Sequence, residues 1–209
     1  MRPSRVCLCK VLPEFPIKSH IKTFIFQHPF EKKQANRTDW VAQRVMSDVS
    51  VIVGRRADKV VDNDFQEAIG LSNDTALLFP SPTSRALSLA SSSELKNLIV
   101  LDGTWKQVRQ MLRDSPQLES LSHFYLELPP SYSGAFLIRK SSESIDDFAP
   151  LCTAEAVSLA IDAITGEDIR TTKTREILST WSQQQITLTS RPVHRPDRPG
   201  YVHNLYNIS

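Results

Sequence analysis

The chain has 209 residues, a length that suits one domain with a hydrophobic core of ordinary size. Hydrophobic residues make up 40% of the sequence and charged residues 23%, values that exclude a fibrous or a disordered chain. The formal net charge of +2 permits a nucleic-acid partner without requiring one, so the local clustering of charge has to decide.

No apolar stretch approaches the roughly 18 residues of a membrane span, and the start of the chain, MRPSRVCLCK, lacks the apolar segment of a secretory signal. We therefore expect a cytoplasmic protein with no membrane partner. The three cysteines also fit a reducing compartment, because their number is odd. Cys7 and Cys9 form a CxC pair, whereas Cys152 has no evident partner base and is expected to be a buried structural thiol.

Short apolar runs that end in turn or polar residues predict β-strands. Because these runs are continuously apolar, they are typical of strands buried on both faces of a parallel sheet. The sequence therefore predicts an α/β fold. The segments are KTFIFQHP at 22–29, VSVIVGRR at 49–56, TALLFPSP at 75–82 and NLIVLDGT at 97–104.

Helical spacing of apolar residues predicts helices between and after these strands. Thr104 is the expected N-cap of one helix, and Gln107 completes a capping-box pattern with it. Thr153 is the expected N-cap of another helix, which Gly166 ends. The predicted helices cover 84–89, 104–113, 153–165 and 173–185.

Ligands of parallel α/β sheets bind beyond the carboxyl ends of the strands. Each predicted strand is followed there by polar residues, and we expect these to converge on one crevice. Asp102 is the leading candidate, because this carboxylate ends a buried strand directly before a helix N-terminus. The other polar residues after the strands are His28, Glu31, Arg55, Arg56, Ser81, Ser84 and Thr104.

The predicted helix at 104–113 has two different sides. One is an apolar stripe of Trp105, Val108 and Leu112. The other is basic and able to meet phosphate, and it holds Lys106, Arg109 and Arg113. One alternative stays open for each side. The basic side could be an ordinary solvated surface, and the Trp105 ring could stack on a base instead of packing in the core.

Several other chemistries lack the residues they require. The LDGT segment resembles aspartate-nucleophile phosphatases, but the position that would carry the attacking acid is Val100. The sequence contains no GxGxxG or GxxxxGK[ST] phosphate loop, no HExxH zinc pair and no GxSxG serine.

Six segments in one order resemble the DTW-domain family, which is named for a DxTW motif. That motif is here Asp102 to Trp105, and the resemblance spans about residues 2–165. Six ordered segments in one short chain make coincidence improbable. They are RPSRVCLC at 2–9, QHPFE at 27–31, LLFPS at 77–81, LDGTWKQVRQML at 101–112, FLIRK at 136–140 and LCTAEAV at 151–157.

The resemblance implies a tRNA-uridine aminocarboxypropyltransferase. Such an enzyme moves the 3-amino-3-carboxypropyl group of S-adenosylmethionine to N3 of a uridine in tRNA and releases methylthioadenosine. The resemblance also implies a SPOUT-like fold, with a C-terminal trefoil knot that holds the cofactor, and it implies no protein partner. Alternatives are a SPOUT-like RNA methyltransferase and a non-catalytic RNA-binding module.

The same resemblance assigns candidate residues. Asp102 is the candidate base or orienting acceptor for uridine N3, and the motif adds Thr104 and Trp105 to the catalytic set. Arg139 would bind the carboxylate of the donor, and the alternative is an ordinary charge at a strand end. For His28 the alternative is that it caps a turn fixed by Pro29. The remaining cofactor candidates are Ser81, Thr153 and Glu155, and the tRNA candidates are His28, Glu31, Lys106, Arg109 and Arg113.

The resemblance divides the chain into an N-terminal arm at 1–20, the DTW catalytic domain at 21–190 and a basic, proline-rich tail at 191–209. Family members usually carry a further CxxC pair that completes a four-cysteine zinc site. Only Cys7 and Cys9 are present in the arm, which would be the remnant of that module, so we expect no well-formed zinc site. The segment at 35–43 also lacks the glycine of the family's Asn-Thr-Gly loop, which puts a turn with positive φ in doubt.

Overall fold

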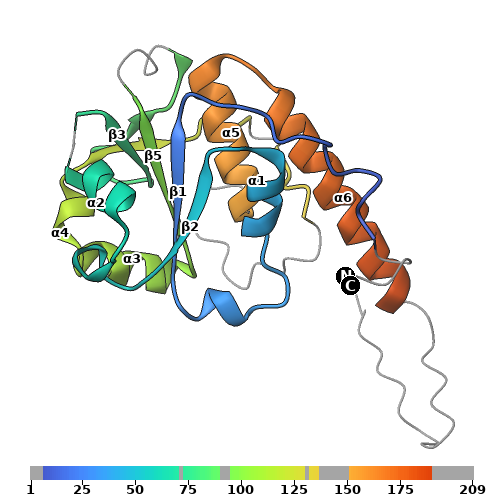
Figure 1. Ribbon diagram of the computed structural model, residues 1–209, viewed down its shortest axis with the longest axis horizontal. Coiled ribbons are helices and arrows are strands. Elements are labelled where there is room, and N and C mark those ends of the chain that lie inside the picture. Colours follow the sequence, from blue (N-terminus) through green and yellow to red (C-terminus); the bar gives the residue numbers. More distant parts are fainter. Residues whose placement is uncertain (1–6, 71–72, 90–94, 130–131, 137–150, 190–209) are drawn as a thin grey trace, which may run out of the picture.

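Six parallel strands form a single sheet in the order β2-β1-β5-β3-β6-β4 (Figure 1). The structure is a computed structural model that describes residues 7–70, 73–89, 95–129, 132–136 and 151–189. All four predicted strands are present and parallel, so the α/β class with a mostly parallel sheet is confirmed. The strands are β1 Lys22–Gln27, β2 Val49–Val53, β3 Thr75–Leu78, β4 Arg85–Ala86, β5 Asn97–Asp102 and β6 Ser122–Tyr125.

Helices cover both faces of this sheet, with α1, α5 and α6 on one side and α2, α3 and α4 on the other (Figure 1). The α-helices are α1 Asp39–Val45, α2 Asn63–Gly70, α3 Trp105–Arg113, α4 Pro116–Glu119, α5 Thr153–Thr165 and α6 Ile169–Thr189. Two 3-10 helices, η2 Glu31–Lys33 and η3 Ala57–Lys59, follow β1 and β2. No helix among the described residues is long and apolar enough to cross a membrane.

The strands β1, β2, β3 and β5 each supply both cores, which explains why their apolar runs are continuous. In β1, Phe24 and Phe26 pack on Phe65 of α2, with ring centroids 5.6 and 5.3 Å apart. Ile25, between them, is fully buried in the other core, against the side of α1 and α5. Alternate side chains of a strand point to opposite faces, so a strand covered on both faces requires apolar residues at every position.

The helix predicted at 84–89 is wrong, because this segment contains strand β4, which pairs with Phe124 and Tyr125 of β6. The Ser84 hydroxyl donates to the Ser81 carbonyl at 2.7 Å and closes a turn ahead of the strand. Leu89 is 59% exposed, so the segment has no buried helical stripe. The other three predicted helices are confirmed as α3, α5 and α6.

The described part of the N-terminal arm lies across α6 and α1 (Figure 1). Leu8 is buried in the same core as the apolar residues of α6, and Gln184 donates to the Cys7 carbonyl at 3.3 Å. Ile17 forms a parallel bridge with Met46, which follows α1. The arm is therefore part of the packed structure from residue 7 onward, while the tail at 191–209 lies outside the described residues.

Candidate active site

Asp102 ends β5, and both of its carboxylate oxygens accept hydrogen bonds from other elements. Gln27, the last residue of β1, donates from Nε2 to Oδ2 at 2.8 Å. Thr153, the first residue of α5, donates from Oγ1 to Oδ1 at 2.5 Å. In the sheet, β2 lies on one side of β1, and β5 and then β3 lie on the other. The carboxyl ends of β1 and β5 therefore form the edge of the sheet where ligand sites occur in such folds. Two donors hold a carboxylate in one orientation at that position.

The N-cap predicted for α5 is wrong by one residue. Cys152 occupies the N-cap, with φ −84° and ψ 161°, and Thr153 is the first helical residue. The Thr153 hydroxyl therefore bonds to Asp102 instead of capping its own helix. The rest of α5 agrees with the prediction, because Gly166 ends it in the left-handed conformation at φ 70° and Cys152 is buried.

Asp39 is a second carboxylate near Asp102, and it was not among the site residues predicted from the sequence. It begins α1, is only 3% exposed, and lies with Oδ1 at 3.5 Å from Arg37 Nε. Burial raises the pKa of Asp39, Arg37 opposes this, and the charge of Asp102 raises the pKa further. Thr38, which precedes it with φ −110°, accepts from the Ala154 backbone N–H at 3.3 Å, so the start of α1 contacts the start of α5.

Two buried acceptor oxygens at this edge have no hydrogen-bond partner among the described residues. They are Gln27 Oε1 and Asp39 Oδ1. Gln27 is fully buried and was also missed as a site residue, although it opens the QHPFE segment. The amide that directly follows the apolar residues Phe24 to Phe26 was the signal that could have identified it. Buried acceptors without a partner are uncommon in folded proteins and favour a site for a donor group.

His28 lies directly beside the Asp102 backbone and forms a capped turn. Its backbone N–H donates to the Asp102 carbonyl at 2.8 Å, and its ring Nδ1 accepts from the Phe30 N–H at 3.3 Å. Burial lowers the pKa of His28, and the Arg55 charge lowers it further. The capped-turn alternative is therefore what the structure contains. Glu31 follows at the start of η2 and is partly exposed.

The DxTW motif joins β5 to α3. Thr104 Oγ1 accepts from the Gln107 N–H at 3.4 Å and the Thr104 N–H donates to Gln107 Oε1 at 2.7 Å, which confirms the predicted capping box. A Cβ on Gly103 would lie 3.2 Å from Gln107 Oε1 and 3.4 Å from His28 Cβ, so the turn leaves little room for a side chain.

The two sides of α3 differ as predicted. Val108 and Leu112 are buried, and the partly exposed Trp105 ring lies 6.2 Å from the Phe79 ring. This contact supports packing as the role of Trp105. The exposed basic residues are Lys106, Arg109 and Arg113.

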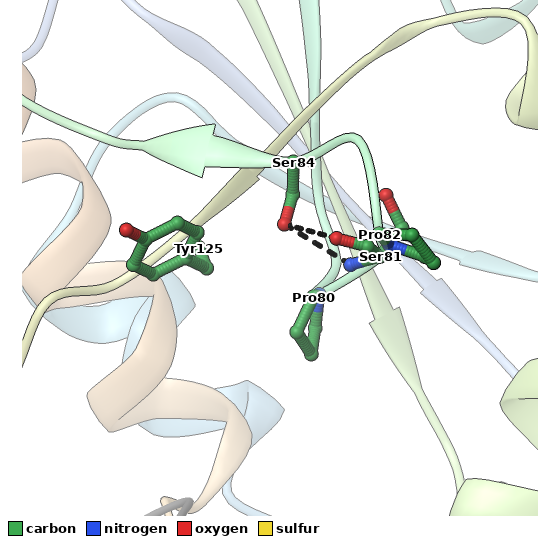
Figure 2. Close-up of a pocket in the computed structure, with 5 residues that line it drawn as sticks. All are labelled: Pro80, Ser81, Pro82, Ser84 and Tyr125. Carbon is green, nitrogen blue, oxygen red and sulfur yellow. Dashed lines mark hydrogen bonds between the residues drawn. The ribbon is translucent and has the colours of Figure 1, made fainter.

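Ser81 lines a hollow beyond β3 and β6 (Figure 2). The Ser81 hydroxyl is 3.0 Å from His123 Nδ1, and its backbone N–H donates to Ser84 Oγ at 3.1 Å. The hollow has a volume of about 450 Å³ and opens beside the turn that leads into β4. Its lining residues are Pro80, Ser81, Pro82, Ser84 and Tyr125.

Glu155 joins α5 to α6 and to the segment 132–136. The fully buried carboxylate accepts from Arg175 Nη1 at 2.6 Å, from the Tyr132 hydroxyl at 2.8 Å and from the Ala135 N–H at 3.1 Å. Burial and the neighbouring Glu155 raise the pKa of Tyr132 to about 12. Arg139 lies outside the described residues.

The cysteines of the arm do not gather further metal-binding side chains in the part of the chain that the structure describes. Cys7 Sγ accepts from the Cys9 N–H at 3.3 Å. The Cys9 thiol, and after it this N–H, lowers the pKa of Cys7. No group of three or more histidine, cysteine or acidic side chains suited to a metal ion occurs among the described residues.

Comparison with known proteins identifies related sequences. A family model described as the DTW domain matches residues 1–188. The chain is 32% identical over 123 residues to tRNA-uridine aminocarboxypropyltransferase 2 of Drosophila melanogaster, covering 57% of this chain and 49% of that protein. It is 28% identical over 163 residues to tRNA-uridine aminocarboxypropyltransferase 2 of Macaca fascicularis, covering 76% of this chain and 54% of that protein.

A plant relative gives a similar result. The chain is 30% identical over 135 residues to tRNA-uridine aminocarboxypropyltransferase A of Arabidopsis thaliana, covering 54% of this chain and 48% of that protein. The chain thus spans about half the length of the curated relatives it matches. No solved structure matches it significantly.

Proposed function

Since the chain belongs to the DTW domain family, we propose that it transfers the 3-amino-3-carboxypropyl group of S-adenosylmethionine to N3 of a uridine in tRNA and releases methylthioadenosine. The observation that carries this proposal is the Asp102 carboxylate, held at both oxygens at the carboxyl edge of the sheet. The names of the relatives supply the reaction and the substrate class.

Uridine N3 is a poor nucleophile while it carries its proton, so the reaction requires a base at that atom. In our proposal, Asp102 accepts the N3 proton while Gln27 and Thr153 keep its carboxylate in place. N3 forms a bond to the γ-methylene carbon of the donor as the bond from that carbon to sulfur breaks. The electron pair stays on sulfur, which leaves as a neutral thioether, and Asp102 later releases its proton to solvent.

The donor supplies an activated carbon next to a sulfonium, and the residues of this chain suit its polar groups. Gln27 Oε1, a buried acceptor with no hydrogen-bond partner among the described residues, suits the ammonium group of the aminocarboxypropyl chain. Asp39 Oδ1, which contacts Arg37 at 3.5 Å without a hydrogen bond, suits the same group. The hollow at Ser81 suits the nucleoside part. Arg139 remains our candidate for binding the carboxylate of the donor. Glu155 holds the segment 132–136, which precedes Arg139 in the chain, by accepting from the Ala135 N–H.

The tRNA is proposed to lie over the carboxyl edge of the sheet. Lys106, Arg109 and Arg113 are exposed on the helix that follows Asp102, where they suit phosphate groups. His28 and Glu31 border the same edge from the turn after β1. Thr104 is assigned to holding the start of α3, and Trp105 to packing beside Phe79.

We further propose a SPOUT-like relationship with a C-terminal trefoil knot. The all-parallel sheet with its site at the carboxyl ends of central strands is compatible with this fold. The arm at 1–20, the catalytic domain at 21–190 and the tail at 191–209 remain our proposed division of the chain.

The released product tests the reaction type directly. We expect incubation with S-adenosylmethionine and an unmodified tRNA transcript to release methylthioadenosine. Release of S-adenosylhomocysteine would instead establish a methyltransferase, and binding of tRNA without either product would favour an RNA-binding module.

A further inference from the structure

Phe30 is a large aromatic residue exposed to solvent close to the candidate active site. It is 54% exposed and occupies the N-cap position of η2. Its side chain belongs to neither of the two hydrophobic cores. Arg55, from the loop after β2, places its guanidinium carbon 5.1 Å from the centre of the Phe30 ring. The His28 ring lies edge-on to Phe30, with centroids 5.1 Å apart and an interplanar angle of 75°.

These contacts tie Phe30 to the proposed base. The Phe30 backbone N–H donates to His28 Nδ1, and the His28 backbone N–H donates to the Asp102 carbonyl. The aromatic ring is thus fixed to the same turn that borders Asp102. The pKa of His28 is lowered, which favours the neutral form of its ring. The positive charge beside the Phe30 ring therefore comes from Arg55.

The surroundings of Phe30 are rich in cations. Lys32 and Lys33 are exposed on η2, and Arg55 itself is exposed. Glu31, which precedes the two lysines in η2, is partly exposed. An exposed aromatic ring with an arginine over one face, and with lysines close by in the chain, is an arrangement with which proteins stack an unpaired base and hold its phosphates.

We propose that Phe30 and Arg55 form a stacking platform for an unpaired nucleobase that neighbours the target uridine in the RNA. This inference rests on the proposed function for the presence of RNA. Arg55 covers one face of the ring, and the exposed area of Phe30 provides the second surface for a planar base. Stacking tolerates any base, so the platform positions the strand while Asp102 acts on the uridine.

Fluorescence of introduced tryptophans tests the stacking. Phe15 is 75% exposed in the N-terminal arm and serves as the matched control position. We expect a short oligouridylate to quench the added fluorescence of Phe30→Trp and to leave that of Phe15→Trp unchanged. Equal quenching of both variants, or of neither, would overturn the platform.

Affinity gives a second measurement, made on the full chain. Phe30→Ala should weaken oligouridylate binding about 5- to 150-fold, the range that base stacking spans, whereas Phe15→Ala should not. Arg55→Ala should also weaken binding, whereas Arg85→Ala removes a cation stacked on Phe124 and should not. An abasic oligomer of the same length should bind wild type and Phe30→Ala equally, and a loss with that oligomer would contradict base stacking.

The platform and the proposed reaction fail in different ways. If Phe30→Ala binds oligouridylate and tRNA like wild type while wild type still modifies tRNA, the platform is wrong and the reaction stands. If Phe30→Ala loses base-dependent affinity but wild type transfers no aminocarboxypropyl group, the platform stands and the reaction is wrong. Thermal unfolding of the variants beside wild type excludes loss of folding as the cause.

Discussion

Gln27 and Asp102 are cross-strand partners at the carboxyl ends of β1 and β5, and their side chains are joined by a hydrogen bond of 2.8 Å. Gln27 is fully buried while Asp102 is partly exposed, so the amide supports the carboxylate from within the protein. Thr153 bonds the other oxygen from α5. The support of Asp102 therefore comes from residues 75 and 51 positions away in the sequence, and the sheet brings them together.

The Thr153 hydroxyl is expected to position Asp102 for catalysis. Thr153→Val keeps the shape of the side chain but removes the donor, and kcat should fall about ten- to a hundredfold, since hydrogen bonds to charged groups contribute about 1.5–3 kcal/mol. Steady-state kinetics with tRNA measure this, with Thr153→Ser restoring activity. Thr172→Val, at an exposed site on α6, is the control. A wild-type kcat in Thr153→Val would remove Thr153 from the mechanism.

The buried Asp39 predicts a pH-dependent stability. Because burial holds the pKa of Asp39 above its ordinary value of 3.8, the folded protein binds this proton more readily than the unfolded chain. The stabilising contribution is complete below pH 3.8 and is lost as pH rises through the raised pKa. The free energy of unfolding of Asp39→Asn, relative to wild type, should therefore increase as pH rises from acid toward neutral. A difference that stays constant between urea titrations at successive pH values would contradict this.

Glu155 is expected to act directly on the stability of the protein and only indirectly on donor binding. Glu155→Gln breaks its pair with Arg175, whose side chain is 36% exposed, and we expect a loss of about 1–3 kcal/mol, less than for a fully buried pair. Urea titration measures the loss. Glu176→Gln, which affects the surface pair with Lys173, should stay within about 0.5 kcal/mol of wild type. If Glu155→Gln were as stable as wild type and only failed to bind donor, Glu155 would be a direct ligand.

Much of the fold was predictable because it depends on patterns of residues that are close together in the chain. The continuous apolar runs of β1 and β5 required burial on both faces, and this placed Asp102 at the carboxyl edge. The capping box of Thr104 and Gln107 was predictable because both partners lie within one turn. The strand β6 was missed because its sequence, SHFY, begins with two polar residues and so shows no continuous apolar run.

The partners of Asp102 were harder to predict, since they are defined by tertiary contacts. A threonine at the first helical position looks like an N-cap in the sequence, and only the approach of α5 to β5 gives the Thr153 hydroxyl its true partner. Asp39 lay in a segment compared with a glycine loop, and its burial depends on the packing of α1 against α5. Arg55 reaches Phe30 only because β2 pairs with β1.

Mass spectrometry of tRNA nucleosides, after incubation with S-adenosylmethionine and either wild type or Asp102→Asn, tests the central claim most directly. Asp114→Asn, at an exposed carboxylate after α3, is the control. We predict an aminocarboxypropyl group on uridine with wild type and Asp114→Asn, and about 10²- to 10⁴-fold slower formation with Asp102→Asn, the contribution expected of a general base. Modification at the wild-type rate by Asp102→Asn, or a methyl group on the uridine, would contradict the account.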